Sequence, residues 1–187
     1  MDQRSLVEQA QRGDHEAFAV LVRATIARLD AAARLILRDR ELARDAVQDS
    51  LIAAWRNLPG LRDPDRFDAW LHRLLVRSCI DALRRRRSRP IEVELPTLYG
   101  PVVGDMDSMI ADREIVDDAL QRLDPSWRAI VVLHYFLGMP LPEASAVLGI
   151  PLGTAKSRLH RSLGHMRNSL VREVGVDVGS SARGHVT

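Results

Sequence analysis

The sequence has a single cysteine, Cys79, and a single lysine, Lys156, among its 187 residues, and aromatic side chains make up only 4%. One cysteine excludes an internal disulfide framework and a zinc site built on several cysteines. With so few aromatics, the core must be built from Leu, Ile, Val and Ala, which favours helices over sandwiches and barrels. No run of about 18 consecutive apolar residues is present, which excludes a membrane-spanning segment from the prediction.

The amino terminus and the overall charge point to no special compartment or partner. The first 18 residues carry acids where a signal peptide would have a basic region and then an apolar core, so we expect a cytoplasmic protein without membrane insertion. Lysine and arginine total 27 against 25 aspartates and glutamates, a net charge of +2, and the mean hydropathy is -0.13. This balance excludes a polybasic tail and an acidic disordered protein.

The net charge conceals strong local charges. Residues 66–89 hold eight arginines and two acids, a local net charge of +6, whereas residues 90–118 hold eight acids and one arginine, a net of -7. Residues 154–172 hold five basic residues and no acid, a net of +5. Arginine suits phosphate and base recognition because its planar fork donates two parallel hydrogen bonds. We therefore expect two nucleic-acid-binding segments separated by an acidic one.

Proline and glycine mark the domain boundaries. Residues 89–105, RPIEVELPTLYGPVVGD, contain three prolines and two glycines without a helical period, which predicts an extended linker. The fold class is therefore all-α with two small helical domains. The predicted division is a first domain over residues 1–90, a flexible acidic linker over 91–111, a second domain over 112–172 and a disordered tail over 173–187.

Caps and apolar spacing predict three long helices in the first domain. Asp14 is expected to cap a helix over residues 15–37, a second helix to run from Glu41 to about Leu58, and a third to begin near Phe67 or Asp68 and end in the arginine run. The side chains expected to face the core are Phe18, Leu21, Val22, Ile26, Leu29, Val47, Leu51, Ala54, Trp55, Leu58, Leu71, Leu74, Leu75, Ser78 and Ala82.

The second domain has the pattern of a helix-turn-helix. We expect a helix from Pro125 to Gly138 that Asp124 caps, a short one from Pro142 to Gly149, and a longer one that Thr154 caps. The inward stripe of the last helix is Ala155, Leu159, Leu163, Met166 and Leu170. Its other face carries donors for base edges and phosphates at the end that would enter a major groove, namely Lys156, Ser157, Arg158, His160 and Arg161.

The second helix of the first domain has an outward face of mixed character. It carries Asp45, Gln48, Asp49 and Ile52, and an isoleucine among acidic and amide groups suggests a protein contact. Spacing alone favours the alternative interpretation, a solvated acidic face with one exposed isoleucine. A metal site from the two aspartates, one helical turn apart, has no histidine or third carboxylate nearby in sequence to complete it.

The third helix presents an aromatic ring among arginines. One face carries Trp70, Arg73, Arg77 and Arg84, and the loop LRDPDR over residues 61–66 precedes it. Bases stack on rings while guanidinium groups hold phosphates, so this face suits single-stranded or unstacked nucleic acid. A core position for Trp70 beside a solvated arginine face is the alternative that the pattern leaves open.

Three segments, ELARDAVQDSLIAAW, FDAWLHRLLVRSCIDALRRRR and LDPSWRAIVVLHYFLGMPLPEASAVLGIPLGTAKSRLHRSL, resemble regions 2 and 4 of an extracytoplasmic-function (group 4) RNA polymerase sigma factor. The resemblance covers roughly residues 5–172 in the order and spacing of that group, which has two domains without a third between them. It implies a promoter-specificity subunit with no catalytic activity and no cofactor. It also implies an acidic linker that threads a basic polymerase channel.

The resemblance assigns a role to each face. Polymerase contacts would involve the beta-prime clamp helices and the beta flap, promoter DNA would be read at its -10 and -35 elements, and an anti-sigma factor would hold the protein inactive. The polymerase-binding residues would be Asp45, Gln48, Asp49 and Ile52; the -10 residues Arg62, Asp63, Arg66, Trp70, Arg73, Arg77 and Arg84; and the -35 residues Thr154, Lys156, Ser157, Arg158, His160 and Arg161.

Two rival functions are weighed against this one. A stand-alone helix-turn-helix regulator would dimerise on a palindrome and needs a self-complementary surface, which the sequence does not show. A nucleic-acid hydrolase would use Asp45 and Asp49 with a metal, but a convergent set of acid, base and ligands is missing. Cys79 is expected to be a small core residue rather than a redox switch.

Overall fold

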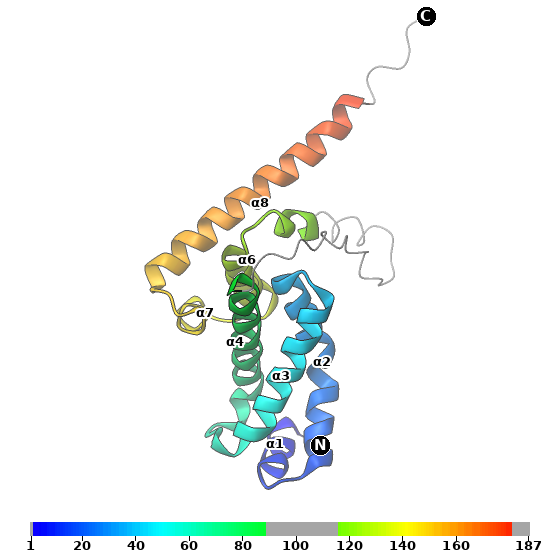
Figure 1. Ribbon diagram of the computed structural model, residues 1–187, viewed down its shortest axis with the longest axis vertical. Helices are drawn as coiled ribbons and strands as arrows, with labels where there is room; N and C mark the ends of the chain where they lie inside the picture. Colours follow the sequence, from blue (N-terminus) through cyan, green and yellow to red (C-terminus); the bar gives the residue numbers. More distant parts are fainter. Residues whose placement is uncertain (1, 89–115, 181–187) are drawn as a thin grey trace, which may run out of the picture.

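The computed structural model describes residues 2–88 and 116–180, and these are helical without any strand (Figure 1). The first domain contains α1 (Gln3–Gln11), α2 (His15–Leu37), α3 (Arg40–Asn57) and α4 (Phe67–Ser88), with single 3-10 turns η1 (Leu58–Gly60) and η2 (Pro64–Arg66) between the last two. The all-α prediction is confirmed. The predicted linker over 91–111 lies outside the described residues.

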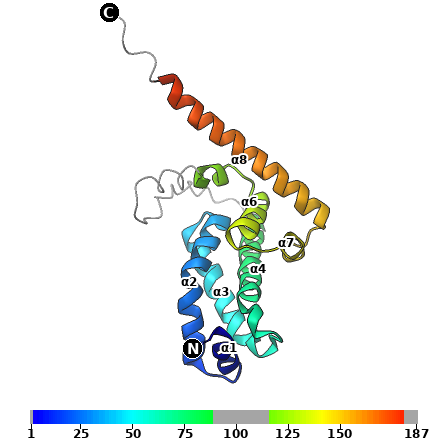
Figure 2. The same ribbon diagram turned by 180° about the vertical axis from the view of Figure 1, so that it is seen from behind.

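The second domain begins with helical residues 116–121 and continues through α6 (Pro125–Val131), η3 (Val132–Phe136), α7 (Leu141–Leu148) and α8 (Leu152–Ser180). The segment η3 is a turn of π-helix that extends α6. The first domain stands as a bundle of α2, α3 and α4 with α1 across one end, and α6 and α7 lie at the other end (Figure 1). Seen from behind, α8 runs obliquely away from the first-domain bundle and from α6 and α7 (Figure 2).

Local capping fixes where the first-domain helices begin. The carboxylate of Asp14 accepts hydrogen bonds from the backbone N–H groups of Glu16 and Ala17, as predicted. Asp39 does the same for Leu42 at the start of α3, a cap that the sequence analysis missed. Both aspartates also suit the positive end of the helix dipole.

The predicted core stripe of α2 is wrong at one position. Ile26 is 42% exposed, although it was expected to face inward. The inward position in that turn belongs to Thr25, whose hydroxyl donates to the carbonyl oxygen of Leu21, 3.0 Å away. Neighbouring positions on a helix differ by about 100°, so a core that selects Leu21 and Leu29 turns Ile26 toward solvent.

The helix-turn-helix has the predicted order, but both ends of its last helix differ from the prediction. Gly149 ends α7 in the left-handed region at φ 65°, where a glycine avoids the strain of a side chain. Helix α8 starts at Leu152, so Thr154 is not its cap; the N–H of Ala155 already donates to the carbonyl oxygen of Pro151, 3.0 Å away. At its other end α8 continues to Ser180, beyond the expected start of the tail at 173, because no proline interrupts it.

The two domains share one apolar core across a seam between α2 and α4 on one side and α6, η3 and α7 on the other. A cavity on this seam is lined by Arg77, Ile80, Asp81 and Arg84 of α4 together with Val147, Leu148 and Gly149. Polar contacts also cross it, among them Arg28 Nη2 to the Phe136 carbonyl at 2.9 Å, Arg128 Nε to the Ile36 carbonyl at 3.2 Å, the Arg38–Asp117 ion pair at 3.8 Å, and the Arg73–Glu143 ion pair.

Candidate functional site

The outward face of α3 is built as the sequence predicts. Its other side is anchored by Ala43, Val47 and Ala54, which are buried against α2 and α4. This leaves Asp45, Gln48, Asp49 and Ile52 exposed. Ile52 is 41% exposed, a large apolar side chain in an acidic surface. Such a surface combines a desolvation gain with charge selectivity, as a protein-docking face requires.

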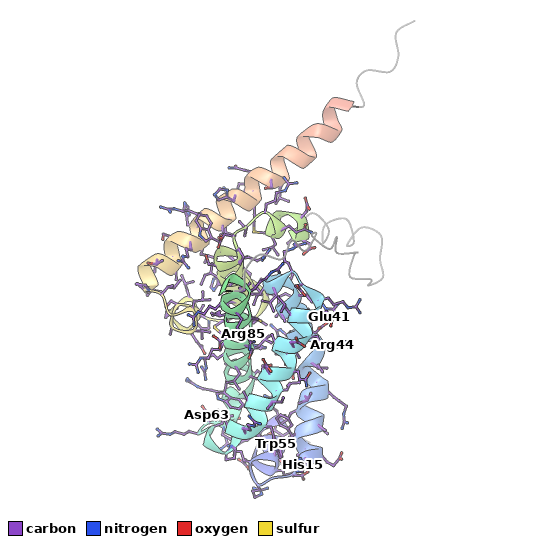
Figure 3. All side chains as sticks on the ribbon, viewed as in Figure 1. His15, Glu41, Arg44, Trp55, Asp63 and Arg85 are labelled. Carbon is purple, nitrogen blue, oxygen red and sulfur yellow. The ribbon has the colours of Figure 1, made fainter. Side chains whose placement is uncertain are left out.

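One carboxylate of this face also contacts the arginine run. Asp49 Oδ2 lies 3.6 Å from Nη2 of Arg85 on α4, and both side chains are more than half exposed. Figure 3 shows Arg85 on α4 beside the outer surface of α3, where Glu41 and Arg44 project into solvent. Because exposed pairs of this kind contribute little, the contact leaves Asp49 available to a partner. Among the described residues no three metal-ligating side chains cluster.

The loop between α3 and α4 is held by its own turn chemistry. The carboxylate of Asp63 accepts from the N–H of Asp65 at 3.1 Å and caps η2, and Arg66 lies 3.4 Å from the same carboxylate. Arg62, Asp63 and Arg66 are exposed, and Asp63 lies at the end of the bundle that is distant from the second domain (Figure 3). They form a polar rim with donors and acceptors for a base edge.

The remaining predicted -10 residues lie at intervals along α4. Trp70 is half-buried against the core, with its ring 6.0 Å from that of Phe67, so it combines a core contact with partial exposure. Arg73 is paired with Glu143, and Arg77 and Arg84 line the seam cavity. At about 1.5 Å per residue, Arg66 and Arg84 are roughly 27 Å apart, too far to contact one base. Arg62, Asp63, Arg66 and Trp70 thus lie in the loop and the first turn of α4, whereas the later arginines lie farther along the helix.

The first turns of α8 present a basic face to solvent. Ala155 and Leu159 are buried against α6 and α7, which fixes the rotation of the helix. Ser162 is also buried, and its hydroxyl donates to the Arg158 carbonyl at 2.8 Å, a core position that the stripe prediction missed. The predicted face is consequently exposed at Lys156, Ser157, His160 and Arg161 and half-buried at Thr154 and Arg158.

Other functional groups lie outside the predicted surfaces. The side-chain amide of Gln11 and the guanidinium of Arg4, both on α1, bind the loop between α3 and α4. Glu143, on α7, pairs with Arg73. No periodicity or motif in the sequence indicates these pairings, because their partners are 47 to 70 residues apart in the chain.

Comparison with known proteins identifies the family of the chain. Residues 21–89 match the family Sigma-70 region 2, and residues 113–166 match the family Sigma-70, region 4. The chain is 34% identical over 136 residues to the ECF RNA polymerase sigma factor SigM of Mycobacterium tuberculosis, covering 73% of this chain and 68% of SigM. The chain belongs to the extracytoplasmic-function RNA polymerase sigma factors.

Further relatives agree with this family. The RNA polymerase sigma factor CnrH of Cupriavidus metallidurans is 36% identical over 157 residues, covering 78% of this chain and 82% of CnrH. The structure of CnrH in complex with the cytosolic domain of CnrY has a TM-score of 0.60 and 31% identity, over 94% of this sigma factor and 98% of that chain. The sigma factor directs core RNA polymerase to promoters through its two sigma regions. No helix in the described part of the chain is long and apolar enough to cross a membrane.

Proposed function

We propose that this sigma factor binds polymerase and promoter DNA through three separate surfaces and has no catalytic activity of its own. The outward face of α3 binds the beta-prime clamp helices of the polymerase. The loop over residues 61–66 and the first turn of α4 capture an unstacked base of the -10 element. The first turns of α8 read the -35 element, and the second domain also docks on the beta flap.

The main support for the proposal is the basic face at the start of α8, which is exposed while the opposite side of the helix is buried. Lys156, His160 and Arg161 point to solvent from the first three turns of a helix whose opposite side is fixed in the core. A recognition helix needs this arrangement, since its side chains must reach base edges while its rotation stays fixed. Each good base contact contributes about 1–3 kcal/mol of discrimination.

The -10 surface combines a ring with a polar rim. Trp70 is half-buried in the first turn of α4, and Arg62, Asp63 and Arg66 are exposed in the adjoining loop. Unstacking a base costs a few kcal/mol, which stacking at about 1–3 kcal/mol per base and phosphate contacts offset. The arginines farther along α4 suit the DNA backbone on either side of that base.

The domain seam has to open before both elements are bound. The -10 and -35 elements are separated by about 25 base pairs, or roughly 85 Å of duplex at about 3.4 Å per base pair. Here α4 and α7 are in direct contact, and Glu143 on α7 forms an ion pair with Arg73 on α4. The closed arrangement therefore corresponds to the free protein, and binding to polymerase supplies the energy that separates the domains.

An anti-sigma factor is the regulatory partner that we propose, with the sigma factor itself in the cytoplasm. The related protein CnrH has been solved in complex with the cytosolic domain of CnrY. Purification from the native host should recover such a partner together with polymerase subunits.

Reconstitution with core polymerase tests the proposal. The sigma factor should support initiation at specific promoters, and no initiation on any genomic promoter by the folded protein would contradict it. Asp49→Arg should weaken binding to core polymerase, with Asp30→Arg on α2 as a charge-matched control. Arg161→Ala should reduce discrimination at the -35 element by about tenfold and leave -10 discrimination unchanged. Tight duplex binding without polymerase would instead favour the dimeric regulator.

A further inference from the structure

The loop between α3 and α4 receives support from a helix outside the matched sigma regions. Residues 58–66 carry two single-turn 3-10 helices and no longer element, and such short turns have little stability of their own. Helix α1, Gln3–Gln11, precedes the region 2 match that begins at residue 21. Nevertheless α1 packs against both η1 and η2 (Figure 1).

Gln11 makes the central contact between α1 and this loop. Its side-chain Nε2 donates to the carbonyl oxygen of Leu58 at 3.1 Å and to that of Leu61 at 2.7 Å. These two carbonyls belong to the beginning and the end of the first loop turn. A carboxamide has two N–H donors, so one side chain can fix both. The amide is half-buried, which limits competition from water.

A second contact fixes the far side of the loop. Arg4 Nη1 lies 2.9 Å from Oδ2 of Asp65 in η2, and Arg4 Nε also contacts Glu8 on its own helix. This pair is exposed and contributes modestly. Helix α1 is itself fixed, because Leu6, Val7 and Ala10 are buried in the core. The loop is thus attached at both ends to a firmly packed helix.

We propose that α1 positions the -10 recognition loop and that Gln11 is its positioning residue. The proposal rests on the proposed role of residues 61–66 in capturing a -10 base. A base pocket has to hold its donors and acceptors in place before the base arrives, since ordering a mobile loop would reduce the binding energy. Gln11 supplies that order from outside the loop, without touching DNA.

The test uses holoenzyme assembled from full-length sigma factor and core polymerase. Gln11→Met keeps the length and apolar stem of the side chain and removes both donors, and Gln11→Glu keeps the shape and replaces the donor by an acceptor. Gln9→Met is the matched control, because the side-chain amide of Gln9 donates to Ser5 Oγ within its own helix, at 3.2 Å. Two readouts are needed: initiation rates on promoters with single -10 or -35 changes, and fluorescence of 2-aminopurine placed in the -10 element.

Both Gln11 variants should lower -10 discrimination about fivefold, the loss expected for one net hydrogen bond of about 1 kcal/mol. They should also reduce the 2-aminopurine signal of the unstacked base. Affinity for core polymerase, -35 discrimination and melting temperature should stay at the level of Gln9→Met. A loss of stability and core binding without a selective -10 effect would overturn the positioning role.

A variant in the loop distinguishes an error in the role of Gln11 from an error in the role of the loop. Asp63→Ala removes the cap of η2 and should change -10 preference if the loop reads that element. If Asp63→Ala changes the preference and Gln11→Met does not, the role of Gln11 is wrong while the loop assignment stands. If neither Asp63→Ala nor Arg62→Ala changes it, the loop does not read the -10 element, and the positioning role is overturned with it.

Discussion

Arg128 on α6 donates a hydrogen bond from Nε to the carbonyl oxygen of Ile36, 3.2 Å away in the last turn of α2. The last carbonyls of a helix have no partner within it, and a cation there also meets the negative end of the helix dipole. Arg128 is only 4% exposed, and burial together with the nearby Arg38 lowers its pKa to about 10. A residue of the second domain thus caps a helix of the first.

Truncation of Arg128 should destabilise the closed arrangement. Arg128→Ala leaves a void and an unpartnered carbonyl, so the free energy of unfolding should fall by about 2–5 kcal/mol. Arg128→Met fills most of the volume but leaves the same carbonyl unpartnered, so it should cost less than Arg128→Ala, about 1–3 kcal/mol. Urea unfolding of the free protein measures both. Equal stability of Arg128→Ala and the parent protein would show that this contact contributes nothing.

The Arg73–Glu143 ion pair should restrain DNA binding by the free protein. Neutralising the acid in Glu143→Gln frees Arg73 for phosphate, and since the pair is about two-thirds buried we expect a two- to fivefold gain, or about 0.4–1 kcal/mol. The measurement is fluorescence anisotropy with a single-stranded oligonucleotide of the -10 element. Glu41→Gln, on the exposed part of α3, controls for the change in net charge. An equal gain in both variants would attribute the effect to net charge alone.

His72 should make stability depend on pH. It is buried in α4, and burial followed by the charge of Arg28 on α2 lowers its pKa, against the opposing pull of Asp68 on α4 and Glu143 on α7. The unfolded chain therefore binds a proton more readily than the folded one. Stability that is present above about pH 6.5 should be lost as the pH falls through the lower folded pKa.

The variant His72→Gln should flatten this loss when denaturation midpoints are compared between pH 7.5 and 5. His160→Gln, at an exposed position of α8, controls for the substitution itself. An unchanged pH profile in His72→Gln would assign the acid sensitivity to other groups.

Cys79 should be chemically inert in the folded protein. Its side chain is fully buried, and burial raises the pKa of the thiol to about 12, so thiolate is scarce at neutral pH. A thiol reagent should modify it only upon unfolding, and peroxide should leave promoter-directed initiation unchanged. Cys79→Ala serves as the comparison. Rapid labelling under native conditions, or peroxide inactivation that Cys79→Ala abolishes, would restore the redox interpretation.

Much of the fold follows from local chemistry. The caps at Asp14 and Asp124 and the left-handed glycine at Gly149 are settled by a few neighbouring residues, so helix positions were predictable. Helix boundaries without such a cap were not predictable. Helix α8 begins at Leu152, two residues before Thr154, the residue expected to cap it. The burial of Trp70 was undecided in the sequence because one ring can satisfy both a core and a solvent contact.

The sequence by itself determined that this chain is a two-part helical sigma factor, since its helix signals, charge blocks and DNA-facing residues lie close together along the chain. Tertiary structure alone decided which of those residues are available to contact DNA or polymerase. Arg73 is paired across the seam, Arg128 caps α2, and Gln11 reaches a loop 50 residues away. Such pairings depend on how helices pack, and packing joins residues whose separation in sequence carries no periodic signal.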